Sequence, residues 1–363
     1  MKTLQKLALA GIAVSLLLAA CAPAATPTPQ VIVQKETVIQ RETVVQEVTP
    51  VPPPAPKRIA LVPAGRVDQP GYIGLAGSGY LKACAEFGLV PKYWEGTTLE
   101  EWERNVRAAA EEGYDLIIGV GSTMADAISN VAPEYPDLRF ALVDMYVGGD
   151  NVEGLIAQEH EGTFLAGALM ALMTTHTELE GINEDKVIGF VGGMDIPVIH
   201  RFLGGIVQGA EYMDPEVQVE IAYVGSFRDS PKAKELALTL FQDQDVDITF
   251  SVAGSFGDTG VFEAVKETGL YGVGSDVDWD SEVPGHILTS VLKKTDLIVR
   301  DCMERFLNGQ FEAGEHFYGA VGGYMDLTDM SVMGDAIPQE YKDQVDAIKD
   351  AIAAGEIQVE RWE

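Results

Sequence analysis

The stretch Lys186–Met213, KVIGFVGGMDIPVIHRFLGGIVQGAEYM, contains the pattern that decides the fold. Its first part, Lys186–Gly192, is almost wholly apolar and includes β-branched Val and Ile, which favour a buried strand. Gly193 follows, and Pro197 suits the first turn of a helix because proline lacks an amide hydrogen. The stretch therefore predicts a strand at Lys186–Gly192 followed directly by a helix at Pro197–Met213.

The same strand–helix order recurs on both sides of this stretch, from Arg58 onward. The other predicted strands are Arg58–Pro63, Asp115–Gly119, Arg139–Asp144, Gly154–Gln158, Gln218–Val224, Asp247–Ala253, Tyr271–Ser275 and Ile287–Val291. The other predicted helices are Gly74–Phe87, Leu99–Glu112, Ala125–Ala132, Glu161–Thr174, Pro231–Gln244, Gly260–Thr268, Thr295–Leu307 and Pro338–Ala354. Strands that are apolar throughout indicate parallel sheets covered on both faces, so we predict a doubly wound α/β fold.

The 363 residues suffice for about two domains of roughly 150 residues each. We expect a first lobe at 57–160, a second lobe at 161–286, and a return segment at about 287–330 that crosses back to the first lobe. Residues 331–363 are expected to form a C-terminal helical region. Two such lobes joined by hinge crossovers enclose a cleft.

The composition excludes several classes of function. Lys and Arg number 25 against 56 Asp and Glu, a net charge of −31 that disfavours a nucleic acid partner. Three cysteines provide no disulfide framework, and whether Cys84 pairs with Cys302 stays open. Five scattered His without an HxxxH or CxxC pattern give no metal signature, so we expect no metal and no cofactor.

The first twenty residues, Met1–Ala20, have the pattern of a signal peptide. Lys2 and Lys6 precede an uncharged apolar run that is too short to span a bilayer. Leu18-Ala19-Ala20-Cys21 resembles a bacterial lipobox, which implies cleavage before Cys21 and attachment of lipid to it. The alternative is an ordinary secretory signal with a coincidental cysteine.

Residues 21–56 follow as a predicted lipid-anchored tether. Eight of the 18 prolines lie here, on both sides of a segment in which Gln34, Gln40 and Gln46 mark a six-residue repeat. Six residues match neither a heptad nor a helical period, so a coiled coil is not supported. We favour a solvated, semi-rigid spacer over a partner-binding segment.

Candidate binding residues follow the predicted strands, because ligands of parallel sheets bind beyond the carboxyl ends of the strands. Aromatic rings, carboxylates and a lysine recur there, as in Asp144, Phe227, Phe256, Asp276, Trp279 and Lys293. Rings offer stacking faces, carboxylates accept hydrogen bonds from hydroxyl groups, and a lysine donates them. This combination indicates a neutral ligand with one flat ring and one polyol.

Several motifs in the body resemble the basic membrane protein family, the purine-nucleoside-binding lipoproteins of ABC importers. They are Glu161–Gly167, Gly189–Pro197, Gly225–Phe227, Gly260–Ala264 and Leu288–Lys293. The resemblance covers about 57–330 and implies a type I periplasmic-binding-protein fold. It also implies a non-enzymatic receptor, anchored by lipid to the extracytoplasmic face of the cell membrane. Such a receptor, expected to be a monomer, captures a small solute and delivers it to permease subunits.

The resemblance also implies roles for individual residues. The family stacks a purine between aromatic rings and holds the ribose with aspartates and a lysine. Tyr72 falls where the family has a stacking Phe, and Phe227 is the second stacking candidate. Asp144 and Asp276 fall on family aspartates, and Lys293 falls on the family lysine. Asp278 and Lys294, each close in sequence to a candidate, remain alternatives to Asp276 and Lys293.

The chain also departs from the family pattern. Asp68-Gln69-Pro70-Gly71-Tyr72-Ile73 replaces an Asn-Asp-x-Ser-Phe-Asn segment, so we include Asp68 and Gln69, whose amide is able to hydrogen-bond a base edge. Phe256 lies in a loop that is Gly/Thr/Asn-rich in the family, and Trp279 replaces a frequent Gln. A free base, another nucleoside or a flavin-like ring therefore remains an alternative ligand, and a ligand sensor remains an alternative role. An enzyme acting on nucleosides is the least favoured hypothesis.

Overall fold

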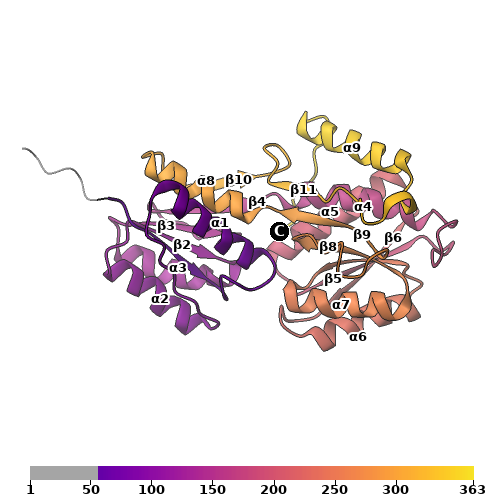
Figure 1. Ribbon diagram of the computed structural model, residues 1–363, viewed down its shortest axis with the longest axis horizontal. Coiled ribbons are helices and arrows are strands. Elements are labelled where there is room, and N and C mark those ends of the chain that lie inside the picture. Colours follow the sequence, from indigo (N-terminus) through magenta and orange to yellow (C-terminus); the bar gives the residue numbers. More distant parts are fainter. Residues whose placement is uncertain (1–55) are drawn as a thin grey trace, which may run out of the picture. The chain divides into compact units, whose positions relative to one another are not determined.

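The computed structural model describes residues 56–363, in which two β-sheets are flanked by α-helices (Figure 1). The predicted signal peptide, Cys21 and the tether up to residue 55 lie outside the described residues. The strands of the described residues are β1 (Ile59–Pro63), β2 (Leu116–Val120), β3 (Arg139–Val143), β4 (Val152–Ala157), β5 (Val187–Gly192), β6 (Gln218–Tyr223), β7 (Ile248–Val252), β8 (Tyr271–Asp276), β9 (Ile287–Lys293), β10 (Gly314–Tyr318) and β11 (Met325–Leu327). The α-helices are α1 (Tyr72–Phe87), α2 (Leu99–Glu111), α3 (Ala125–Val131), α4 (Glu159–Thr174), α5 (Pro197–Met213), α6 (Ser230–Asp243), α7 (Gly254–Thr268), α8 (Thr295–Leu307) and α9 (Gln339–Ala353).

The first sheet has the strand order β1-β2-β3-β4-β10, and all its strand pairs are parallel. Strands β1 and β2 are buried along their whole length, as their continuous apolar sequences predict. Strand β4 is buried as well, and its one charged residue, Glu153, forms an ion pair with Arg305 at 2.9 Å. Figure 1 shows α1 and α8 on one side of this sheet and α2 and α3 on the other. We call this sheet and its helices lobe 1.

The second sheet has the order β11-β9-β8-β7-β5-β6 and is parallel except for the short β11, which pairs antiparallel with β9. Helices α4 and α5 pack together on one side, and α6 and α7 pack together on the other (Figure 1). Helix α9 packs against α4. We call this sheet and its helices lobe 2, and the prediction of doubly wound parallel sheets is confirmed.

The chain passes between the lobes three times, after β4, after β9 and between β10 and β11. The return to lobe 1 begins after Lys293 rather than at about residue 287. The reason is that β9 pairs in parallel with β8 over its length and so belongs to lobe 2. Only α8 and β10 of the expected return segment lie in lobe 1, since β11 is again part of lobe 2.

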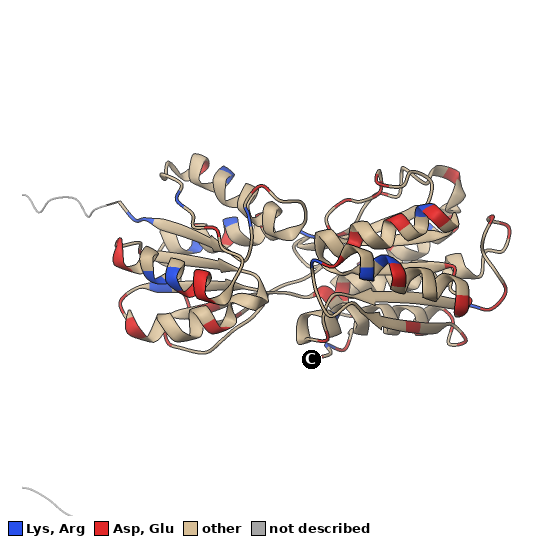
Figure 2. Cartoon of the chain, turned by 90° about the horizontal axis from the view of Figure 1, so that it is seen from below, with Lys and Arg blue, Asp and Glu red and all other residues tan. Residues whose placement is uncertain are grey.

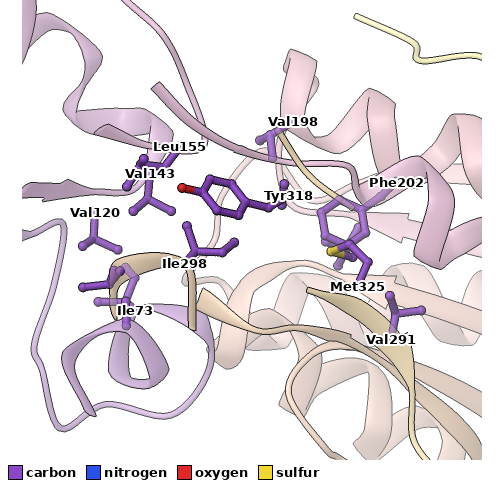
Figure 3. Close-up of a cluster of buried hydrophobic side chains, with 14 of the residues drawn as sticks. Ile73, Val120, Val143, Leu155, Val198, Phe202, Val291, Ile298, Tyr318 and Met325 are labelled. Atoms are coloured by element: carbon purple, nitrogen blue, oxygen red, sulfur yellow. The ribbon is translucent and has the colours of Figure 1, made fainter. Parts of the chain in front are cut away.

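One buried apolar cluster runs through both lobes and the crossing segments. Figure 3 shows Val120, Val143 and Leu155 of lobe 1 near Ile298 and Tyr318, with Phe202, Val291 and Met325 of lobe 2 farther along. A second, smaller cluster lies in lobe 2 and includes Val191, Leu240 and Phe262. The shared cluster packs the crossing segments against both lobes, next to the ends of the strands.

Acidic residues lie over both lobes and outnumber the basic ones (Figure 2). Among the described helices, none is long and apolar enough to cross a membrane.

Candidate functional site

A cavity lies between the two lobes at the carboxyl ends of their strands. Lobe 1 contributes Ala64, Gln69, Tyr72, Ile73, Thr97, Trp102, Ser122, Thr123 and Asp144 to its lining. Lobe 2 contributes Val198, Ile199, Phe202, Phe227, Arg228, Val252, Gly254, Ser255, Phe256, Asp276 and Lys293. Apolar walls with a few polar groups from two lobes are typical of a site for a small organic molecule.

Two aspartates occupy matching places in the two sheets. Asp144 directly follows β3 in lobe 1, and Asp276 ends β8 in lobe 2. Both have left-handed backbones, with φ of 84° and 68°, although neither is a glycine. Such backbones cost free energy and persist where the surrounding structure enforces them, often at ligand sites. Both side chains line the cavity while being 2% and 8% exposed.

Lys293, the last residue of β9, joins these groups into a buried network. Its Nζ lies 2.5 Å from Asp144 Oδ1 and 2.8 Å from Glu159 Oε1. Arg201 on α5 donates from Nε to Glu159 Oε2 at 2.7 Å and from a terminal nitrogen to the carbonyl oxygen of Asp144 at 3.1 Å. Glu159 belongs to the first turn of α4, so four elements from both lobes meet here.

Burial and these ion pairs shift the pKa values in the network. Burial would raise the pKa of Glu159, but Arg201 and Lys293 outweigh it and lower the value to about 2. Burial would lower the pKa of Lys293, but Asp144 and Glu159 raise it above its usual value. Burial raises the pKa of Asp276 to about 7, against the lowering effect of Lys293. Lys293 is therefore a permanent donor, whereas Asp276 is able to accept or donate a hydrogen bond near neutral pH.

Aromatic side chains line the cavity from both lobes, and two of them lie beside its charged end. Lys293 Nζ lies 5.2 Å from the ring centre of Tyr72 and 5.7 Å from that of Phe202. Phe227 lies against the backbone of Gly193 and Gly254, where an added Cβ would meet its side chain. Phe256, in the first turn of α7, is 50% exposed and lines the outer part. Flat faces thus come from both lobes, as a planar ligand requires.

Comparisons with known proteins agree with this geometry. The sequence profile of the Bmp family, described as ABC transporter substrate-binding protein PnrA-like, matches residues 57–362. This chain belongs to the Bmp family.

Relatives and solved structures extend the match. The ABC transporter nucleoside-binding protein BmpA of Lactococcus lactis subsp. cremoris is 29% identical over 286 residues, covering 74% of this chain and 77% of the relative. Basic membrane protein A1 of Borrelia garinii subsp. bavariensis is 26% identical over 308 residues, covering 83% and 87%. A solute-binding protein of an ABC transporter system from Aeropyrum pernix superposes with a TM-score of 0.75 at 26% identity, covering 84% of this chain and 93% of that one. The family resemblance and the periplasmic-binding-protein fold are therefore confirmed.

Most of the predicted site residues of this Bmp-family protein lie together in the cavity. They are Gln69, Tyr72, Asp144, Phe227, Phe256, Asp276 and Lys293. The alternatives to two of them lie elsewhere: Asp278 is exposed and accepts from the Asp280 amide at 2.9 Å, and Lys294 lies 3.6 Å from Asp326. Whether the seven residues contact a ligand stays a prediction.

Two predicted site residues do not line the cavity. The exposed Asp68 forms an ion pair with Arg66 at 2.8 Å, because the two side chains meet within one turn. Trp279 packs on Phe262, with ring centres 5.4 Å apart, and donates to the carbonyl oxygen of Ser275. Its ring borders a separate groove outside the cavity. These contacts hold both side chains away from the position we expected.

The cysteines within the described residues are unpaired. Cys84 and Cys302 are both buried and free, and Cys302 Sγ donates to Glu153 Oε1 at 2.9 Å. In the same part of the chain, residues 56–363, no group of three or more His, Cys, Asp or Glu is arranged to hold a metal ion.

Sequence reasoning missed several residues of the site. Glu159 and Arg201 complete the buried network, and Phe202 and Arg228 line the cavity. Arg201 offered a sequence signal, because it is a charged residue next to the apolar stretch Phe202–Val207. Glu159 offered none, since its neighbours Gln158, His160 and Glu161 are polar as well. A buried charge requires a partner of opposite charge, so the two residues are expected to lie in one network.

Proposed function

We propose that this ABC-transporter substrate-binding protein of the Bmp family binds a nucleoside, most simply a purine nucleoside, in the cavity between its lobes. The observation that carries the proposal is the meeting of Asp144, Asp276 and Lys293 beside the ring of Tyr72. Two carboxylates and an ammonium group match the vicinal hydroxyls of a ribose, which both donate and accept hydrogen bonds.

The aromatic side chains supply the complementary half of the site. Tyr72 from lobe 1 and Phe227 from lobe 2 present faces on which a base is able to stack. The printed name of the Lactococcus relative, a nucleoside-binding protein, supports the same ligand class. A site of this kind binds without bond rearrangement, and we propose that the chain acts as a receptor and not as an enzyme.

Isothermal titration calorimetry on the full chain tests the ligand. We expect purine nucleosides to bind and Asp276→Ala to abolish that binding. Asp278→Ala, two residues away but outside the cavity, is the matched control and should bind normally. Binding of free bases alone would contradict the assigned ribose contacts, and binding of riboflavin in preference to nucleosides would favour a flavin-like ligand. Recovery of unchanged ligand by chromatography checks the absence of catalysis.

We also propose that Cys21 carries the lipid that anchors the protein on the extracytoplasmic face of the membrane, and that the bound solute passes to permease subunits. The lipobox-like sequence before Cys21 supports the anchor. Membrane fractionation should recover the natural chain with the membranes and a Cys21→Ser variant in the soluble fraction. Uptake of labelled nucleoside should be lost when the gene is deleted, whereas a pure sensor would leave uptake unchanged.

A further inference from the structure

We propose that Arg228 makes this protein selective for nucleosides of 6-oxopurines, guanosine and inosine, over adenosine. This inference rests on the proposed function, because it names the class of base that the nucleoside site prefers. Arg228 lies in the loop between β6 and α6, next to Phe227, and lines the cavity from lobe 2.

The guanidinium of Arg228 is available to a ligand. The residue is exposed, and its only recorded hydrogen bond is from its backbone amide to Ser226 Oγ at 3.0 Å. Among the arginines of residues 56–363, only Arg104 and Arg228 lack a side-chain hydrogen bond, ion pair or ring contact. In a chain with 56 acidic and 25 basic residues, a cation left unpaired at the rim of a cavity is unexpected for a purely structural residue.

The polar groups of the cavity divide by depth. The buried end holds Asp144, Asp276 and Lys293, none more than 8% exposed, which match a ribose. The outer part holds Arg228, Gln69 and the hydroxyl groups of Thr97, Thr123 and Ser255. Gln69 Oε1 accepts from the Arg66 amide at 2.9 Å, and Ser255 Oγ donates to the Pro70 carbonyl oxygen at 2.7 Å. Gln69 keeps its Nε2 as a donor and a second lone pair on Oε1 as an acceptor. Arg228 is the only one of these side chains that solely donates, so a base placed against its guanidinium would meet hydrogen-bond donors there.

Donors at the rim discriminate between purines. A 6-oxopurine presents O6 and N7 as adjacent acceptors, which fit the planar fork of an arginine, whereas adenine presents a donating amino group beside N7. Placing that amino group against a guanidinium loses one hydrogen bond and brings two donors together. We expect guanosine to bind about tenfold more tightly than adenosine, the lower part of the range for such pairs because Arg228 is exposed.

Calorimetry with guanosine, inosine and adenosine tests the inference on the full chain. Arg228→Ala should weaken the binding of guanosine and inosine about tenfold and leave the affinity for adenosine nearly unchanged. The preference for 6-oxopurine nucleosides should therefore disappear. Arg228→Lys, which keeps the charge but not the fork, should restore only part of it. Arg104→Ala is the control, since Arg104 is also exposed and forms no side-chain hydrogen bond or ion pair but lies outside the cavity. Its affinities should equal those of the natural chain.

The contrary results are distinct. Equal affinity for guanosine and adenosine, or an equal loss of both in Arg228→Ala, overturns the selectivity and leaves the nucleoside site standing. Tighter binding of guanosine monophosphate than of guanosine, lost in Arg228→Ala, would assign the guanidinium to a phosphate and likewise overturn it. Absence of binding for every nucleoside by the natural chain defeats the proposed function itself.

Discussion

The ammonium group of Lys293 lies 2.5 Å from the carboxylate of Asp144, and this ion pair joins the two lobes. Lys293 ends β9 in the second sheet, while Asp144 follows β3 in the first. Both side chains are almost fully buried, so the pair is not screened by solvent. The same ammonium lies 2.8 Å from Glu159, which ties the pair to Arg201 and to helix α5.

Replacement of Lys293 by methionine should destabilise the protein. Lys293→Met retains the length of the side chain but leaves Asp144 and Glu159 without their shared cation, and breaking a buried pair costs about 3–5 kcal/mol. We expect the free energy of unfolding, measured by urea denaturation, to fall by about that amount. Lys294→Met is the control, because Lys294 is partly exposed and 3.6 Å from its partner, so its loss should cost about 1 kcal/mol or less. Equal effects of the two changes would contradict a structural role for the network.

Asp276 should make stability depend on pH. Burial raises its pKa from 3.8 to about 7, so between these two values the folded chain binds a proton that the unfolded chain does not. The stability that this proton provides is fully present below pH 3.8 and is lost as the pH rises through 7. Asp276→Asn removes this dependence. Between pH 5 and pH 8, we expect the free energy of unfolding of the variant to rise by on the order of 2 kcal/mol relative to that of the natural chain.

Urea denaturation of both proteins at the two pH values measures this gain. The comparison is needed because burial also raises the pKa values of Asp247 and Asp258 to about 7. Asp247 contributes equally to both proteins, whereas the charge of Asp276 is a minor cause of the raised pKa of Asp258. Asp278→Asn, at an exposed position two residues further on, serves as the control and should follow the natural chain at each pH. A constant difference between Asp276→Asn and the natural chain at pH 5 and 8 would refute the raised pKa.

The sequence allowed most of the fold to be predicted because its signals were local. Strands β1–β9 are mostly continuous apolar runs, and each was expected within about two residues of its position. Strand β10 was not expected, since Gly314–Tyr318 alternates between half-buried and exposed residues and lies at a sheet edge. Its pairing with β4, more than 150 residues away, depends on contacts that no local pattern encodes.

The same distinction applies to the site. Asp144, Asp276 and Lys293 stand at strand ends, so their positions followed from the strands themselves. Glu159 and Arg201 meet only because α4 packs against α5, which the spacing of either helix does not reveal. Trp279 was misplaced for a similar reason, since its loop folds back onto Phe262 of α7.

Gly71 should be needed for the lobes to approach each other. Its φ is 84°, and an added Cβ would overlap Ser255 Oγ, which donates to the Pro70 carbonyl oxygen at 2.7 Å across the cavity. Gly71→Ala should therefore weaken ligand binding as well as strain the backbone. Gly88→Ala is a matched control, because Gly88 also has a positive φ, 69°, but an added Cβ there would meet nothing within 4 Å.

Gly88→Ala should lose roughly 1 kcal/mol of stability, because Gly88 is in the left-handed helical region. Gly71→Ala should lose more, on the order of 1–3 kcal/mol, because φ of 84° with ψ of −169° is a conformation that is almost confined to glycine. Only Gly71→Ala should also raise the dissociation constant of the ligand, about tenfold if separation of the lobes costs roughly 1.4 kcal/mol of binding free energy. Calorimetry and urea denaturation of the two variants separate these effects. An unchanged affinity in Gly71→Ala would show that Ser255 and Pro70 have no part in closing the cavity.

Counting reactive thiols tests burial and lipid attachment together. Cys84 and Cys302 are at most 1% exposed, and burial beside Glu153 raises the pKa of the Cys302 thiol, so neither should react with a thiol reagent in the folded protein. The chain has three cysteines. If lipid occupies the sulfur of Cys21, the folded protein purified from membranes should show no reactive thiol and the denatured protein two. A Cys302→Ala variant should then show one reactive thiol after denaturation.

The contrary outcomes are distinct. Three thiols in the denatured natural chain would contradict the lipid anchor. Any thiol that reacts before denaturation would contradict either the anchor or the burial of Cys84 and Cys302.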